Sequence, residues 1–290
     1  MIKNKTAVVG VLYPSAKPFI YSYINSLDNQ TYKQFDLILM NDGIDNPQSF
    51  FKNSVLSPTI YDAHGTPAKI RLDLIRKTLD LGYNYIIFTD CDDYFSENRI
   101  EILILKLIDN DIVINDLDII SEDNSLSEKL YLSNRITNEA EISSKNILSC
   151  NMMGLTNTAS NSLVLKKCLP FMEVDVIAFD WLLWTYALNF GFKAIFTSDT
   201  STKYRVYSGN VAGLPQIIGK KEVLHELDIK IAHYRQLINL GIEYEKLYNI
   251  FLELQKNSLD LDWFDNYIST LEANKVSKPM WWENVKIFKE

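Results

Sequence analysis

The sequence predicts an α/β fold with a mostly parallel sheet flanked by helices, followed by an α-helical C-terminal appendage. Two observations lead to this class. Over the first 120 residues, short apolar runs alternate with amphipathic stretches, and repeated strand, helix, strand is typical of a parallel sheet covered on both faces. From Lys220 onward, the apolar residues recur only at helical spacing.

Six apolar runs bounded by polar or turn residues are expected to form buried strands. In chain order they cover residues 6–12, 35–40, 85–88, 111–115, 162–166 and 193–196. Helical patterns fall around residues 19–27, 67–82 and 179–191. Pro67 suits the first turn of the second helix, and Gly82 and Gly191 suit helix C-termini.

The chain length allows one large domain or a domain with an appendage. We expect residues 1–219 to form the α/β domain, in two halves of about 1–120 and 121–219, and residues 220–290 to form the helical appendage. Residues 122–150 are polar and weakly periodic, so they are interpreted as a mobile loop or an insertion over the site.

Composition excludes several classes of function. Acidic residues outnumber basic ones by 37 to 29, for a net charge of −8, which does not suit binding to a nucleic-acid backbone. Three widely spaced cysteines favour neither a disulfide framework nor a zinc site, so a reducing, cytoplasmic location is expected. The N-terminal apolar run suits a core strand better than a signal peptide, and no run approaches the ~20 apolar residues of a membrane span.

Polar residues follow three of the expected strands. Pro14 and Ser15 follow the first strand, Asp42 follows the second, and the acidic residues of segment 90–93 follow the run 85–88. Parallel strands release their chain at the same edge of the sheet, and ligands bind outside those carboxyl ends. The three polar tips are therefore expected to meet in one binding site.

Closely spaced carboxylates repel one another, so this acidic segment needs a compensating charge. A divalent cation with oxygen ligands, Mn²⁺ or Mg²⁺, is the usual source. The alternative is a solvated acidic turn that caps a helix near Ser96. An EF-hand calcium loop is excluded, because Tyr94 and Phe95 stand where it needs an oxygen ligand and a glycine. A phosphatase with a nucleophilic aspartate stays open as a weaker alternative.

The segments QTYKQFDLILMNDG and IIFTDCDDYF together resemble the family 2 glycosyltransferases of the GT-A fold. The match in register covers roughly residues 6–215. The resemblance implies a Rossmann-like nucleotide-diphospho-sugar transferase fold. It also implies that the first half of the domain binds the nucleotide sugar and that the second half binds the acceptor.

The resemblance further implies roles for single residues. Asp42 is expected to hydrogen-bond the base at uracil N3, Asp90 to bind the ribose or sugar, and Asp92 to ligate the metal that bridges the diphosphate. Lys69 and Arg71 fall where the family often places a basic residue near the nucleotide. The alternative for these two is a solvated helix face.

Transfer to an acceptor hydroxyl requires a base, because an alcohol is a poor nucleophile until its proton is removed. Asp180, at the start of an apolar helix, matches the family's acidic residue in that role, and a helix N-cap is its simpler alternative. Trp181 and Trp184 are more typical of core than of sugar stacking. Tyr207 stands where the family often has a histidine, and it is expected to contact the diphosphate.

The expected function is inverting transfer of a sugar, from a UDP-linked donor, to a hydroxyl of a saccharide or lipid-linked saccharide in bacterial surface polysaccharide or glycoconjugate synthesis. Two alternatives stay open. One is a metal-dependent phosphohydrolase that uses Asp90 and Asp92, and the other is a catalytically silent module that binds sugar nucleotides. A lipid-linked acceptor would bring the enzyme to the inner face of the membrane.

Paired tryptophans, Trp281 and Trp282, stand near the C-terminus. They suit packing back onto the domain, contact with a second subunit, or a membrane interface. Residues 220–290 hold ten basic and twelve acidic side chains, so no polybasic surface favours anionic lipid. A homodimer formed through the apolar stripes of the appendage is the hypothesis for this region.

Overall fold

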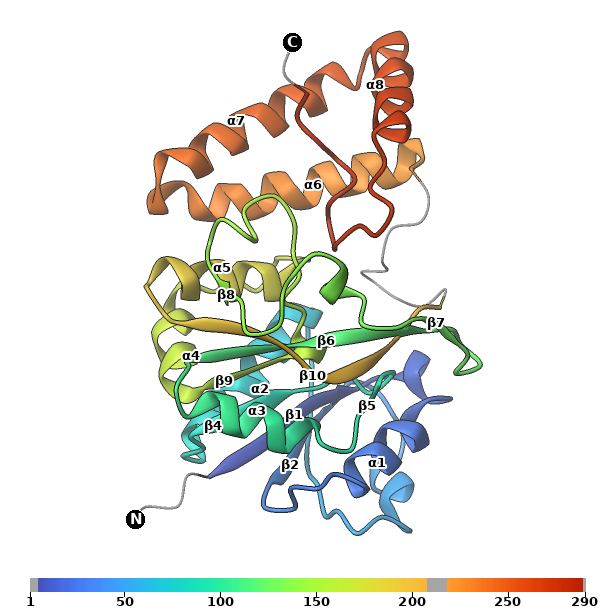
Figure 1. Cartoon of the computed structure of the whole chain (residues 1–290), viewed down its shortest axis with the longest axis vertical. Coiled ribbons are helices and arrows are strands. Elements are labelled where there is room, and N and C mark those ends of the chain that lie inside the picture. The colour runs from blue at the N-terminus through green and yellow to red at the C-terminus, as the bar shows by residue number, and fades with distance from the viewer. Residues whose placement is uncertain (1–4, 208–217, 289–290) are drawn as a thin grey trace.

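The computed structural model describes residues 5–207 and 218–288, and it contains one large twisted sheet (Figure 1). The first half of the sheet is parallel, with β1 at its centre, between β2 and β4. Its strands are β1 (Thr6–Leu12), β2 (Asp36–Asn41), β3 (Thr59–Asp62) and β4 (Tyr85–Phe88). The carboxyl ends of these strands lie at one edge, as expected.

The second half of the sheet mixes directions. β9 (Thr158–Asn161) runs antiparallel between β4 and β6 (Ile112–Ile120), and β6 pairs in parallel with β10 (Ala194–Arg205). Three short antiparallel strands complete it, namely β5 (Tyr94–Phe95), β7 (Leu126–Glu128) and β8 (Glu141–Ile142). The predicted α/β class and the mostly parallel sheet flanked by helices are therefore confirmed.

Helices cover both faces, because alternate residues of each strand point to opposite sides. Val8 belongs to the core on the side of α1 (Ile20–Asp28) and α3 (Arg99–Leu107). Ala7 and Val9 belong to the other core, with the helices α2 (Pro67–Asp80), α4 (Ser162–Cys168) and α5 (Phe179–Asn189). Short 3₁₀ turns fill the connections, including η1 (Pro14–Ala16), η2 (Pro47–Phe51), η3 (Leu132–Asn134), η4 (Leu155–Asn157), η5 (Leu169–Phe171) and η6 (Ile238–Leu240).

The end of β4 is fixed against β1 by a close approach at Gly10. A Cβ atom on Gly10 would lie 2.8 Å from Oγ1 of Thr89, so only glycine leaves room for that hydroxyl. The Thr89 hydroxyl donates to the Val9 carbonyl at 2.8 Å and lies 2.9 Å from the Tyr23 hydroxyl. This contact anchors the residue from which the acidic turn starts.

Two strand predictions need correction. Residues 162–166 form part of helix α4, not a strand. Asn161 caps that helix by accepting from the Val164 N–H at 3.1 Å, and the true strand, β9, ends at the same residue. A short apolar run does not distinguish a strand from one turn of buried helix. In addition, β3 was missed, so the acidic turn follows the fourth strand rather than the third.

The appendage consists of α6 (Lys220–Leu237), α7 (Ile242–Asn257) and α8 (Leu261–Ala273), which lie at the opposite end of the molecule from α1 (Figure 1). Its apolar stripes belong to the same buried cluster as α5. The Trp181 ring stacks on His233 with centroids 3.8 Å apart, and Tyr234 stacks on Phe251. The stripes are thus largely covered within one chain. The boundary at residue 219 and the homodimer stay predictions.

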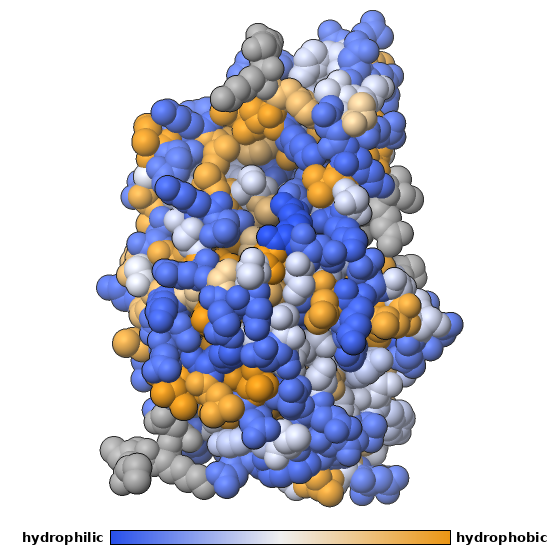
Figure 2. All heavy atoms as spheres, viewed as in Figure 1, coloured by the Kyte–Doolittle hydropathy of each residue, from blue (hydrophilic) through white to orange (hydrophobic). Residues whose placement is uncertain are grey.

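In the described residues, no helix is long and apolar enough to cross a membrane. On the face drawn in Figure 2, hydrophobic residues form separate small groups among hydrophilic ones. No continuous apolar belt is seen on that face.

His233 is a buried imidazole whose two ring nitrogens have no hydrogen-bond partner among the described residues. Burial, reinforced by the nearby Lys230 cation, holds its pKa well below the usual range. The unfolded chain takes up a proton on this residue below about pH 6.5 and the folded chain does not, so acid favours the unfolded state.

We expect the free energy of unfolding to fall by about 1.4 kcal/mol per pH unit below pH 6.5 through this residue. His233→Phe keeps the stacking and should flatten that part of the profile, measured by urea denaturation between pH 7.5 and 5. The exposed His64→Gln is the control. An unchanged acid slope in His233→Phe would contradict the assignment.

Candidate active site

The carboxyl edge of the sheet opens into a cavity of about 510 Å³. Its walls come from the ends of β1, β2 and β4, from α2, η4 and the start of α5, and from the C-terminal segment. Seven of the nine residues expected at the site line it: Pro14, Ser15, Asp42, Arg71, Asp90, Asp92 and Asp180. The fold therefore gathers side chains that are up to 166 positions apart in the sequence, from Pro14 to Asp180.

The other two expected residues lie outside the lining. Tyr207 stands beside Asp92 and packs edge-on against Phe19, with ring centroids 5.0 Å apart. Lys69 pairs with Asp73 on the outer face of α2 at 2.5 Å, and its side chain is 47% exposed. The arrangement of α2 thus turns Arg71 toward the cavity and Lys69 toward solvent.

Asp93 also lines the cavity, and both of its carboxyl oxygens are used in bonds within the protein. One oxygen accepts from the Thr156 hydroxyl at 2.6 Å, and the other accepts from the Arg205 N–H at 2.8 Å. Burial nevertheless raises its pKa well above the usual range, and Asp92 and Asp90 add to the effect. This buried carboxylate fixes the turn through two hydrogen bonds that cross to η4 and β10.

Asp92 is 6% exposed and lies at the cavity wall beside two phenols. Burial raises the pKa of its carboxyl, and interactions with Tyr13 and Tyr207 oppose that rise. Burial and the charge of Asp92 in turn raise the pKa of Tyr207 to about 12. Burial and the charge of Asp92 also raise the pKa of Tyr13, so both phenols keep their protons at neutral pH and can donate to Asp92.

Asp90 and Asp180 face the same cation. Burial raises the pKa of Asp90 to about 6, the Arg71 guanidinium opposes this, and the charges of Asp92 and Asp180 add to it. Burial also raises the pKa of Asp180, and Arg71 is again the largest opposing influence. Arg71 thus links a carboxylate after β4 to one at the start of α5.

Asp180 is the second residue of α5 and not its N-cap, which is Ala178. Its carboxylate accepts from the Trp181 N–H at 2.8 Å. A helix N-terminus favours a nearby negative charge, while burial disfavours one. A carboxylate with a raised pKa at a cavity wall has the properties of a general base.

Two buried guanidiniums hold the acidic turn from behind. Arg205 donates from Nε to the Asp92 carbonyl at 2.7 Å and from Nη1 to the carbonyls of Ser121 and Glu122 at 3.1 Å. Arg99 donates to the carbonyls of Phe88 and Thr156 at 3.1 and 2.7 Å. Burial lowers the pKa of Arg99 to about 9, so it stays cationic at neutral pH.

Several residues of this site were missed by the sequence prediction. Tyr13 directly follows β1 and carried the same strand-end signal as Pro14. Arg99 and Thr156 carried no local signal, because their roles depend on pairing between distant segments. Trp281 and Trp282 line the cavity. Of the three placements considered for this pair, the structure shows packing back onto the domain.

The possible metal ligands of the site can be compared with what a divalent cation needs. Among residues 5–207 and 218–288, no group of three histidine, cysteine or acidic side chains is placed to hold an ion. Asp92 and Asp90 both line the cavity, and burial disfavours their charged forms. Magnesium and manganese sites often combine one or two carboxylates with substrate phosphates. The residues fit a cation of that kind, completed by a diphosphate.

The bond between Thr156 and Asp93 can be tested by Thr156→Val, which removes the hydroxyl and keeps the shape. The buried carboxylate loses a donor, so we expect the free energy of unfolding to fall by about 1–3 kcal/mol in urea denaturation at pH 7. Thr185→Val is a matched control, because its hydroxyl donates at 2.7 Å to a neutral helix carbonyl. Thr185→Val should lower the free energy of unfolding by less than Thr156→Val does. Equal losses would contradict a contribution of the Thr156–Asp93 bond beyond that of an ordinary bond to a helix carbonyl.

The fold and the site define a class of enzyme. A Rossmann-like sheet with aspartates after two parallel strands, and an acidic helix start across one cavity, is the arrangement of a GT-A glycosyltransferase. The model of the family described as glycosyl transferase family 2 matches residues 11–167, which is more than half of the chain. The protein belongs to glycosyl transferase family 2.

Individual relatives agree with this family. The chain is 25% identical over 226 residues to the UDP-Glc:alpha-D-GlcNAc-diphosphoundecaprenol beta-1,3-glucosyltransferase WfaP of Escherichia coli, covering 76% of this chain and 86% of that protein. Among solved structures, S. aureus TarS 1–349 in complex with UDP-GlcNAc has a TM-score of 0.61 at 14% identity, covering 86% of this chain and 71% of that one.

A second solved structure is the mannosyltransferase PcManGT from Pyrobaculum calidifontis in complex with GDP-Man and Mn²⁺. It has a TM-score of 0.58 at 14% identity and covers 96% of this chain and 77% of that one. At these identities the two structural likenesses show a shared fold.

Proposed function

We propose that this glycosyltransferase moves a sugar, with inversion, from a UDP-linked donor to a hydroxyl of a lipid-linked saccharide. One observation carries the proposal. The cavity holds Asp42, Asp90 and Asp92 from the ends of β2 and β4, and Asp180 at the start of α5. A nucleotide sugar on the first half of the sheet would then present its anomeric carbon between Arg71 and Asp180.

The donor end consists of the first loop and the ends of β2 and β4. Asp42 is held in place because its N–H donates to the Leu12 carbonyl at 2.7 Å, and the neighbouring Asn41 closes the loop through two hydrogen bonds of 3.0 Å to Ile44. An aspartate there would accept from the N3–H of uracil. A UDP donor is supported by the relatives, because WfaP is named for UDP-Glc and the TarS structure is a complex with UDP-GlcNAc.

The chemical step assigns one role to each carboxylate. Asp180 takes the proton of the acceptor hydroxyl while the oxygen attacks the anomeric carbon from the face opposite the diphosphate. The carbon–oxygen bond to UDP breaks, and the configuration inverts. Asp92 would hold Mn²⁺ or Mg²⁺, which when bound stabilises negative charge on the diphosphate, and Asp90 would contact the ribose or the sugar. Tyr13 and Tyr207, protonated beside Asp92, would donate hydrogen bonds to phosphate oxygens.

A lipid-linked acceptor is supported by the name of WfaP, which acts on alpha-D-GlcNAc-diphosphoundecaprenol. An enzyme with such an acceptor would work at the inner face of the membrane, in the synthesis of a surface polysaccharide or glycoconjugate. It would reach the membrane through its substrate, by peripheral association.

Release of UDP separates this proposal from its alternatives. With Mn²⁺, UDP-glucose and an α-N-acetylglucosaminyl diphosphate ester of undecanol, we expect UDP and a disaccharide in equal amounts. Hydrolysis of simple phosphate esters would favour a phosphohydrolase that uses Asp90 and Asp92. Binding of UDP-sugars with no turnover would favour a silent module.

Asp92→Asn removes the charge that would hold the metal. We expect UDP binding in the presence of Mn²⁺ to weaken by at least about tenfold in titration calorimetry, which corresponds to about 1.4 kcal/mol. Asp109→Asn, on the exposed turn after α3, is the control. If Asp92→Asn binds UDP with Mn²⁺ as tightly as the unmutated protein does, Asp92 is not a metal ligand.

Asp180→Asn keeps the shape of the side chain and removes the base. We expect turnover to fall ~10²- to 10⁴-fold with the dissociation constant for UDP nearly unchanged. Asp175→Asn, on the exposed loop just before α5, is the matched control. A collapse of donor binding in Asp180→Asn would instead make Asp180 a donor contact.

A further inference from the structure

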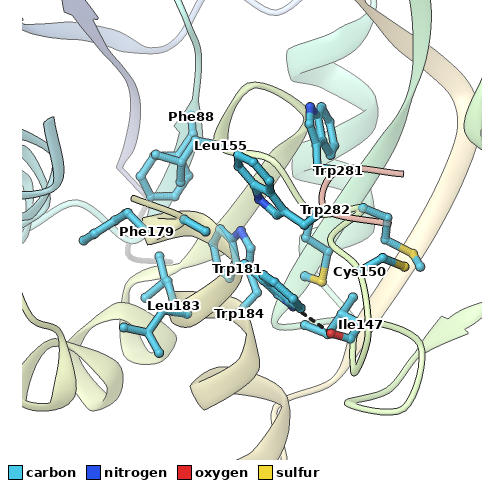
Figure 3. Packing of buried hydrophobic residues seen from close by; sticks show 14 of the residues in the cluster. Phe88, Ile147, Cys150, Leu155, Phe179, Trp181, Leu183, Trp184, Trp281 and Trp282 are labelled. Carbon is cyan, nitrogen blue, oxygen red and sulfur yellow. Dashed lines mark hydrogen bonds between the residues drawn. The ribbon is translucent and has the colours of Figure 1, made fainter. Parts of the chain in front are cut away.

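The C-terminal strap, residues 278–286, returns from α8 to the cavity and brings two tryptophans to it. Trp281 and Trp282 stand there with Gly154, Leu155 and the start of α5. Figure 3 shows both indoles beside Leu155, with Trp181 and Trp184 close by. The strap therefore forms a wall on the side of the cavity that carries Asp180.

The strap is held at both ends by contacts that lie outside the cavity. Towards the α/β domain, Lys278 pairs with Glu128 at 2.6 Å, the Tyr131 hydroxyl donates to the Pro279 carbonyl at 2.8 Å, and Arg135 makes two bonds to Glu283 of 2.5 and 2.8 Å. Towards the appendage, the Val285 N–H donates to Glu226 at 2.8 Å. These contacts fix the backbone on either side of the two tryptophans.

Trp281 is used for structure. Its Nε1 donates to the Tyr204 hydroxyl at 3.3 Å, and its carbonyl accepts from the Asn151 N–H at 2.9 Å. Its ring also covers Gly154, where an added Cβ would lie 3.2 Å from the indole. Trp281 is thereby held from three sides.

Trp282 is held in an unusual backbone conformation, with φ of 61°. A bulky residue in the left-handed region is a strained outlier. Strain of this kind persists where the surroundings enforce it, and it is found preferentially at ligand sites. Trp282 is 9% exposed and lines the cavity, and its ring meets that of His225 edge-on with centroids 6.2 Å apart. The strained residue therefore stands at the cavity, and unlike that of Trp281 its indole makes no hydrogen bond within the part of the chain that the structure describes.

We propose that Trp282 is the platform on which the sugar ring of the acceptor stacks. The inference rests on the proposed function and adds the recognition of the acceptor to it. A pyranose has a face of C–H groups that packs on the electron-rich face of an indole. Leu155, Ala178 and Asp180 line the same cavity as Trp282, so a ring stacked on Trp282 would place its hydroxyls in the space that Asp180 also borders.

The test uses Trp282→Phe and Trp282→Leu with UDP-glucose, Mn²⁺ and the undecyl diphosphate ester of N-acetyl-α-D-glucosamine. By analogy with the stacking of bases on aromatic side chains, we expect the Leu variant to raise the KM for the acceptor by about tenfold to a hundredfold. The Phe variant should raise it less. The dissociation constant for UDP and the acceptor-independent hydrolysis of UDP-glucose should not change. Trp263→Leu, in α8, is the control.

Two outcomes would overturn the proposal. One is an unchanged acceptor KM in Trp282→Leu. The other is an equal loss of UDP binding, which would make Trp282 a donor contact or a purely structural residue.

A second measurement does not depend on turnover or on the Leu variant folding. The protein is labelled with 5-fluorotryptophan, and the ¹⁹F resonance of Trp282 is assigned by its absence from Trp282→Phe. Titration with methyl N-acetyl-α-D-glucosaminide should shift this resonance more than that of Trp263. If the unmutated enzyme transfers no sugar, the proposed function fails, but this shift still decides the role of Trp282. No shift of the Trp282 resonance would overturn the proposal.

Discussion

The site is organised by the burial of the closely spaced carboxylates that follow β4. Asp90, Asp92 and Asp93 lie within four residues, and burial raises the pKa of each one. Each is offset by a different partner: Arg71 for Asp90, two phenols for Asp92, and the bonds from Thr156 and Arg205 for Asp93. Asp90 and Asp92 at the cavity wall remain short of positive charge, which supports the proposed binding of a cation together with a diphosphate.

Much of this arrangement could be predicted, because it depends on strand ends. The apolar runs of β1, β2 and β4 fix which residues leave the sheet at its carboxyl edge, and parallel pairing brings those residues together. Asp42, Asp90 and Asp92 follow from that rule alone. The family resemblance was needed for Asp180, since nothing local distinguishes a base from a helix cap.

The parts that could not be predicted depend on tertiary contacts. Whether residues 162–166 form a helix is decided by the Asn161 cap and by which side chains face the core. Lys69 and Arg71 are two positions apart on α2, and only the orientation of that helix sends one to Asp73 and the other to the cavity. The strap is a similar case. It is held by the pairing of Arg135 with Glu283, which are 148 positions apart, and nothing in the sequence around the two tryptophans indicates that contact.

The contacts divide the cavity into two independently supported ends. The proposed donor end is built on β1, β2 and β4, whose positions are set by backbone pairing and by the close approach at Gly10. The opposite end is built on η4, α5 and the strap, which are joined by Asn151, Trp281 and the pair of Arg135 with Glu283. The strap is anchored by Lys278, Pro279, Glu283 and Val285, and none of these contacts involves the side chain of Trp282. If the two ends bind acceptor and donor as proposed, substitutions at one end should change the choice of one substrate without changing the choice of the other.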